Sequence, residues 1–81
     1  MSDSPLSEVE AHYLLKDLCV QLGYFLPPDD IARLTTNPPT DVDAFVEAVF
    51  VAEGFDPELV ERRSRKAVRE IVARSFNRAR G

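Results

Sequence analysis

The sequence contains few of the residues that most often carry catalysis or hold metals: one cysteine, Cys19, and one histidine, His12, in 81 residues. A single thiol excludes a disulfide within the chain, and a thiolate zinc site would need several chains. On one helix, seven residues would place His12 and Cys19 about 10 Å apart along the axis, too far for a catalytic dyad. We therefore predict a protein that is not an enzyme and has no cofactor or metal. The alternative, a site at His12, Tyr13 and Cys19, requires a deep pocket lined by all three.

Clustered glycines and long apolar runs are also missing. The glycines stand alone at Gly23, Gly54 and Gly81, so no loop has the composition that wraps a phosphate. The longest apolar run, Ala48 to Ala52, is far shorter than the roughly 20 residues of a membrane-spanning helix, and the acidic start does not have the pattern of an export signal. We expect a cytoplasmic protein that binds no membrane, and the excess of Arg over Lys is typical of a GC-rich bacterial source.

Helical periodicity and helix-boundary residues define four segments, and strand alternation is absent. Ser7 and Glu10 predict a capping box at the start of the first helix. That helix should end near Leu22, because Gly23 tolerates the left-handed turn that follows a helix. A short second helix is expected over residues 28–34.

The third helix is expected at the centre of the fold. Thr40 and Asp43 resemble a capping box, so the helix should begin at Asp41. Apolar residues cover most of its circumference, which is typical of a buried helix. Phe50 and Val51 point off its main face, so they should need cover from the second helix or from another chain. A homodimer is therefore one expectation.

A long fourth helix is predicted with Asp56 as its cap, Pro57 at its first position and an end near Arg78. Residues 62–81 hold eight bases and one acid, a net charge of +7. Residues 1–61 hold thirteen acids and two bases, a net charge of −11. The sequence thus consists of an acidic part followed by a basic helix.

These elements predict an all-α fold class, a small single-domain bundle over residues 1–81. Because the connections are short, three main helices and one short helix should pack as antiparallel neighbours. Residues 1–6 and 79–81 should fray. The predicted core comprises Leu14, Leu15, Leu18, Leu22, Ile31, Leu34, Phe45, Val46, Val49, Phe50, Val60, Val68, Ile71 and Val72.

A basic stripe is the first candidate for a binding site. One sector of the helical wheel holds Arg62, Lys66, Arg69 and Arg80, with Arg65 at its edge. The candidate binding residues of this stripe are Arg62, Arg65, Lys66 and Arg69. Such a stripe could meet an acidic protein or nucleic-acid phosphates. It could equally stabilise its own helix through pairs such as Glu58 with Arg62, or lie against the acidic surface of the other helices.

Tyr24, Phe25 and Leu26 are the second candidate. They could plug the open end of the bundle, or Tyr24 and Phe25 could anchor a partner, because aromatic rings bury a large area at low entropic cost. Our first hypothesis is therefore a small non-catalytic protein-interaction or regulatory module that binds another protein through its helical surface. The alternative is a nucleic-acid-binding accessory protein that uses the basic stripe.

Overall fold

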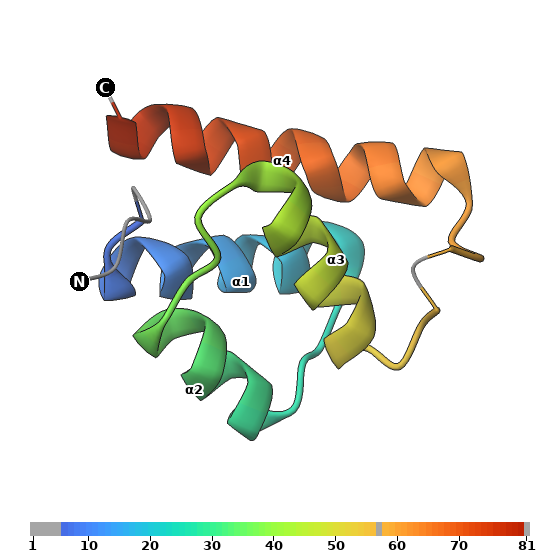
Figure 1. Cartoon of the computed structure of the whole chain (residues 1–81), viewed down its shortest axis with the longest axis horizontal. Helices are drawn as coiled ribbons and strands as arrows, with labels where there is room; N and C mark the ends of the chain where they lie inside the picture. The colour runs from blue at the N-terminus through green and yellow to red at the C-terminus, as the bar shows by residue number, and fades with distance from the viewer. Residues whose placement is uncertain (1–5, 57, 81) are drawn as a thin grey trace.

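The computed structural model describes residues 6–56 and 58–80, and in them it contains four helices and no strand (Figure 1). In chain order the helices are α1 (Glu8–Leu22), α2 (Pro28–Thr36), α3 (Val42–Ala52) and α4 (Arg62–Arg80). The predicted all-α bundle of three longer helices and one short helix is confirmed. Within this described part, no helix combines the length and the apolar character that crossing a membrane requires.

Both ends of α1 follow the signals in the sequence. The Ser7 hydroxyl accepts a hydrogen bond from the Glu10 amide at 3.2 Å, and the Glu10 carboxylate accepts one from the Ser7 amide at 3.2 Å. At the other end Gly23 adopts the left-handed conformation with φ 75°, and its amide donates to the Cys19 carbonyl at 3.0 Å. The predicted capping box and the predicted glycine stop are both confirmed.

The start of α3 differs from the prediction by one residue. Asp41 is the N-cap, and its carboxylate accepts a hydrogen bond from the Ala44 amide at 2.7 Å. The predicted capping box of Thr40 and Asp43 is therefore wrong. Aspartate satisfies a free amide at a helix start as well as threonine does, and its negative charge also favours the positive end of the helix dipole. The Asp43 side chain is consequently available for a contact with another helix.

The start of α4 is the largest departure from the sequence-based prediction. The Asp56 carboxylate accepts a hydrogen bond from the Glu58 amide at 3.0 Å, and the Asp56 carbonyl accepts one from the Leu59 amide at 2.9 Å. This local turn competes with helix formation, so α4 begins only at Arg62. The predicted helical pair of Glu58 with Arg62 is wrong, because Glu58 precedes the helix. The prediction for Pro57 lies outside the described residues.

Helices α1 and α4 each pack on two other helices, whereas α3 has only α4 as a close partner, so the predicted central position of the third helix is wrong. Helices α1 and α4 lie side by side and run in opposite directions, α3 packs on α4, and α2 packs on α1 (Figure 1). The end of α1 and the start of α4 therefore lie at the same end of the bundle, next to the connections formed by residues 23–27 and 53–61.

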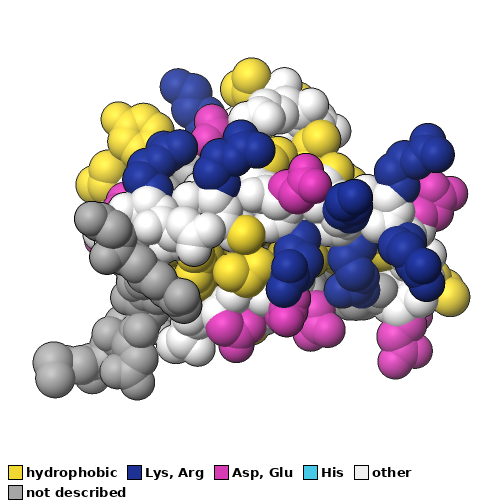
Figure 2. All heavy atoms as spheres, turned by 90° about the horizontal axis from the view of Figure 1, so that it is seen from above, with side chains coloured by type: hydrophobic (Ala, Val, Ile, Leu, Met, Phe, Trp, Pro, Cys, Tyr) yellow, Lys and Arg dark blue, Asp and Glu magenta, His cyan; other side chains and the backbone are white. Residues whose placement is uncertain are grey.

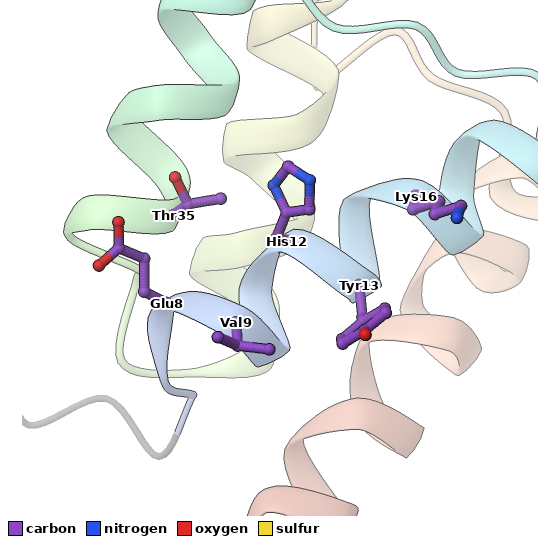
Figure 3. A pocket seen from close by; sticks show the side chains of 6 residues that line it. All are labelled: Glu8, Val9, His12, Tyr13, Lys16 and Thr35. Atoms are coloured by element: carbon purple, nitrogen blue, oxygen red, sulfur yellow. The ribbon is translucent and has the colours of Figure 1, made fainter.

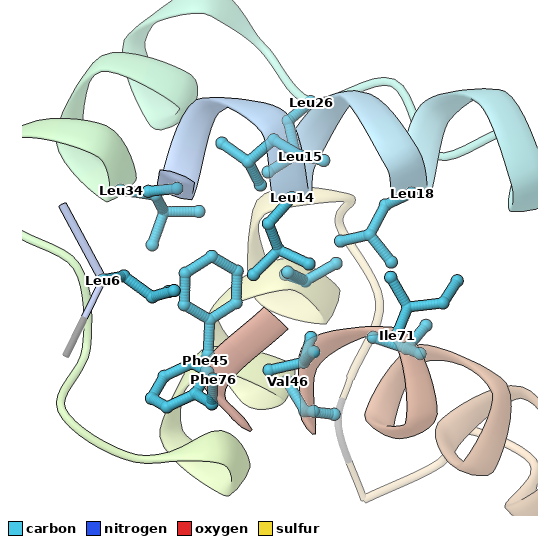
Figure 4. Packing of buried hydrophobic residues seen from close by; sticks show 14 of the residues in the cluster. Leu6, Leu14, Leu15, Leu18, Leu26, Leu34, Phe45, Val46, Ile71 and Phe76 are labelled. Carbon is cyan, nitrogen blue, oxygen red and sulfur yellow. The ribbon is translucent and has the colours of Figure 1, made fainter. Parts of the chain in front are cut away.

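One apolar cluster fills the space between the helices (Figure 4). The rings of Phe45 from α3 and Phe76 from α4 meet edge to face with their centroids 6.2 Å apart. The buried hydrophobic residues of the cluster are Leu6, Ala11, Leu14, Leu15, Leu18, Leu26, Leu34, Phe45, Val46, Val49, Phe50, Val68, Ile71, Val72 and Phe76.

Three predicted core residues are less buried than expected. Ile31 and Val60 are only partly buried against the cluster, and Leu22 is 37% exposed. Leu22 is the last residue of α1, where the chain leaves the helix. The prediction missed four buried residues, namely Leu6, Ala11, Leu26 and Phe76.

The chain ends also differ in detail from the expectation of fraying. Leu6 is buried, and α4 continues through Arg80, two residues beyond its predicted end. Residues 1–5 and 81 lie outside the described residues.

Candidate interaction surface

The basic stripe predicted from the sequence lies on α4. Positions i, i+3, i+4 and i+7 of a helix share one face, which places Arg62, Arg65, Lys66 and Arg69 in a row. Arg62, Lys66 and Arg69 are exposed, and Arg65 is half-buried. Among the described residues, neither Arg62 nor Lys66 forms an ion pair.

Arg69 connects this row to α3. Its Nε lies 3.0 Å from the Asp43 carboxylate, in a pair whose two side chains are 54% and 75% exposed. An exposed pair of this kind contributes about 0.2–1 kcal/mol. The expectation that the basic stripe lies against the acidic helices thus holds for Arg69, and this member of the stripe supports the packing of α4 on α3.

Arg65 and Tyr24, which were separate candidates in the sequence, meet at the ring of Phe50. The guanidinium carbon of Arg65 lies 5.9 Å from the centroid of that ring, within the range of a cation–π interaction. The Tyr24 ring meets the same ring edge-on at 6.0 Å, and Phe55 meets it at 6.3 Å. Phe50 is therefore covered by its own chain, and the expectation that the second helix or another chain covers it is wrong. Val51, by contrast, is 57% exposed.

A cleft of about 210 Å³ opens beside Phe50, between the start of α4 and the two connections. We call it the Phe50 cleft; its lining residues are Tyr24, Phe50, Phe55, Leu59, Val60, Glu61 and Ser64. Phe55 is 50% exposed and Leu59 is 81% exposed, so apolar side chains are accessible at this site. Sequence reasoning missed both residues, because it placed Leu59 inside the fourth helix and assigned no role to Phe55.

The connection between α1 and α2 contributes a second accessible ring. Leu26 is buried and Tyr24 is half-buried, as expected for residues that plug the end of the bundle. Phe25 does not plug the bundle, because it is 73% exposed. It lines a neighbouring cavity of about 210 Å³, and Tyr24 is a wall of both this cavity and the Phe50 cleft. We call Tyr24, Phe25, Phe55 and Leu59 the apolar end.

The largest groove lies elsewhere, between α1 and the end of α2 (Figure 3). It has a volume of about 450 Å³, and its lining residues are Glu8, Val9, His12, Tyr13, Lys16 and Thr35. All of these side chains except Thr35 are exposed, so the groove is open to solvent. Cys19 shares a different cavity with His12, so the structure does not bring His12, Tyr13 and Cys19 together in one deep pocket. The described residues also include no group of three His, Cys, Asp or Glu side chains that could hold a metal ion.

Burial changes the titration of Glu53. It follows α3, and one of its carboxylate oxygens is buried without a hydrogen-bond partner in the described part of the chain. Desolvation by burial raises the pKa of Glu53 above its ordinary value. Its carboxylate is therefore less favourable in the folded protein than in the unfolded chain.

The view onto α4 in Figure 2 shows how the charges are distributed. Lys and Arg side chains follow the outer side of this helix along its length, with acidic side chains beside them. At the end where α4 begins, basic, acidic and hydrophobic side chains lie next to one another.

No known family model, curated protein or solved structure matches this chain.

Proposed function

We propose that this protein is a non-catalytic interaction module and that it binds another protein at the apolar end, next to Arg62 and Lys66. The observation that carries the proposal is the exposure of Phe25, Phe55 and Leu59 around clefts at one end of the bundle. A phenylalanine can bury about 200 Å², so exposed fractions of 73% and 50% correspond to roughly 250 Å² of accessible ring surface. With Leu59, the exposed area is within the few hundred Å² that often mark a functional patch.

The neighbouring cations give this surface a second property. Arg62 and Lys66 are exposed and lie one helical turn apart at the start of α4, and Arg62 directly follows Glu61, which lines the Phe50 cleft. Exposed charges at the rim of an interface mainly affect the rate of association and the choice of partner, whereas buried apolar anchors slow dissociation. We therefore expect the apolar residues to determine affinity and the cations to make association sensitive to salt.

The test is affinity capture with the whole chain, followed by identification of bound proteins by mass spectrometry at low salt. The informative variant is Leu59→Ser, because Leu59 is exposed and its replacement does not disturb the core. Val9→Ser is the matched control, since Val9 is 63% exposed and lies near the start of α1. We expect a protein that is retained by the native chain and by Val9→Ser but is lost with Leu59→Ser. Equal capture by both variants would contradict the proposal, and so would capture of nothing by a chain that also does not bind a second copy of itself.

A second candidate function, nucleic-acid binding through the same basic row, is favoured by the exposed cations along α4 (Figure 2). Counterion release from phosphates would make such binding fall steeply with salt. The net charge of −4 opposes it at long range, so binding would depend on the row itself. A gel-shift titration at about 50 mM salt should then show binding that Arg62→Glu abolishes, and no binding at this salt concentration would end the idea.

A further inference from the structure

We infer that the apolar end binds a second copy of this chain in a two-fold symmetric dimer. The inference rests on the proposed function, because it names the partner of the same surface. Two features of the described residues support it: an exposed side chain next to a cleft of matching size, and a group of acidic residues followed directly along the chain by a group of basic ones where that cleft opens. A third feature, the amount of apolar surface exposed, sets the strength of the dimer.

The first feature is the position of Leu59 at the mouth of the Phe50 cleft. A two-fold interface uses the same patch on both copies, so a protruding side chain must have a receiving cavity close to it on the same surface. Leu59 is 81% exposed, and the cleft beside it has a volume of about 210 Å³. An apolar cavity of roughly 150 Å³ can already hold benzene, so this cleft can receive one leucine or phenylalanine side chain. Leu59 of each copy can therefore enter the cleft of the other.

The second feature is the order of the charges next to the cleft. The acidic side chains of the connection, Asp56, Glu58 and Glu61, are followed directly by basic side chains in the first turns of α4, Arg62, Arg63, Arg65 and Lys66. A partner of one charge sign would be attracted by one of these groups and repelled by the other. A second copy related by a two-fold axis through this region presents its acidic connection to the basic helix start, and the reverse, so both groups are matched.

The third feature, the exposed area, sets the strength of the dimer. Roughly 250 Å² of phenylalanine surface and the Leu59 side chain are less than the about 800 Å² that each partner buries in a standard stable interface. We therefore expect a dimer that dissociates on dilution, with monomer and dimer both populated between roughly 10 µM and 1 mM.

The first experiment measures the mass of the whole chain in solution by sedimentation equilibrium across this concentration range. The native chain should shift from monomer to dimer as the concentration rises. Leu59→Ser should raise the dissociation constant roughly tenfold or more, because it removes the side chain that fills the cleft. Val9→Ser should leave the constant unchanged, and circular dichroism should show that both variants keep the helical content of the native chain.

The second experiment reverses the charges on either side of the cleft. One variant, Glu58→Arg with Glu61→Arg, makes the connection net basic like the helix start, and the other, Arg62→Glu with Arg63→Glu and Lys66→Glu, makes the helix start net acidic like the connection. Each should be monomeric alone because like charges then face each other. An equal mixture should form a heterodimer, since every pair is again opposite in sign. This rescue would also show that both variants are folded.

Three results would overturn the inference: a native chain that stays monomeric at the highest concentration, a Leu59→Ser variant that dimerises as the native chain does, or a mixture that stays monomeric. A monomeric native chain that still captures another protein in a Leu59-dependent manner would overturn the dimer and leave the proposed function standing. If the chain is monomeric and captures nothing that depends on Leu59, both fail.

Discussion

Replacing Val49 by alanine should destabilise the protein strongly, because Val49 lies in the apolar cluster between the helices. The Val49 side chain is completely buried. Its truncation removes two methyl groups, at about 0.8 kcal/mol for each buried carbon, and leaves a cavity that adds to the loss. We expect the free energy of unfolding to fall by about 2–3 kcal/mol, out of a total of about 4–12 kcal/mol for a chain of this length. The melting temperature should fall by roughly 10–20 °C.

The matched control is Val51→Ala, the same chemical change two residues later in the same helix. Val51 is 57% exposed, so its truncation should change the free energy of unfolding by less than about 0.5 kcal/mol, and the better helix propensity of alanine opposes even that loss. The measurement is urea unfolding followed by far-ultraviolet circular dichroism, with equal slopes for all chains. Equal midpoints for the two variants would refute the burial of the Val49 side of α3 in the core. Val49→Asp, which buries an unpaired charge, should abolish the cooperative transition.

Three further predictions concern a turn, an ion pair and a buried acid. Gly23→Ala should lower the free energy of unfolding by about 1 kcal/mol, because Gly23 has φ 75° and nothing lies near enough to clash with the added carbon; an unchanged urea midpoint would show that the left-handed turn is not required. A double-mutant cycle on Arg69 and Asp43 should give a coupling of about 0.2–1 kcal/mol that shrinks in high salt, and zero coupling at low salt would contradict the ion pair. The raised pKa of Glu53 means that its protonated form favours folding, a contribution present at pH below 4.5, the ordinary value, and lost as the pH rises through the folded pKa. Glu53→Gln should therefore melt higher than the native chain at pH 7, with a difference that closes on acidification, and a pH-independent difference would contradict the assignment.

The helix boundaries that depend on local chemistry were the most predictable part of the fold. Ser7 and Glu10 cap α1, and Gly23 ends it, because these contacts involve residues close in sequence. The start of α4 was less predictable because two local structures compete there. Asp56 followed by Pro57 is a good helix start in isolation, yet the Asp56 side chain forms a turn instead.

The candidate surface was predictable only in part. The helical periodicity put Arg65 at the edge of the basic stripe, but it could not show that Arg65 and Tyr24 would both meet the ring of Phe50. That meeting depends on how two connections far apart in the sequence pack against Phe50. Leu59 is accessible because it lies in the connection before α4 and not within that helix. The sequence pattern predicted a helix at this position.

The position of α4 in the bundle has a consequence for folding during synthesis. This helix is the element that packs on both α1 and α3, yet it is translated after them. While it is being made, the faces of the earlier helices that α4 will cover have no partner, and α2 packs mainly on α1. The nascent chain therefore has no self-sufficient N-terminal unit, and the whole core forms in one late cooperative step.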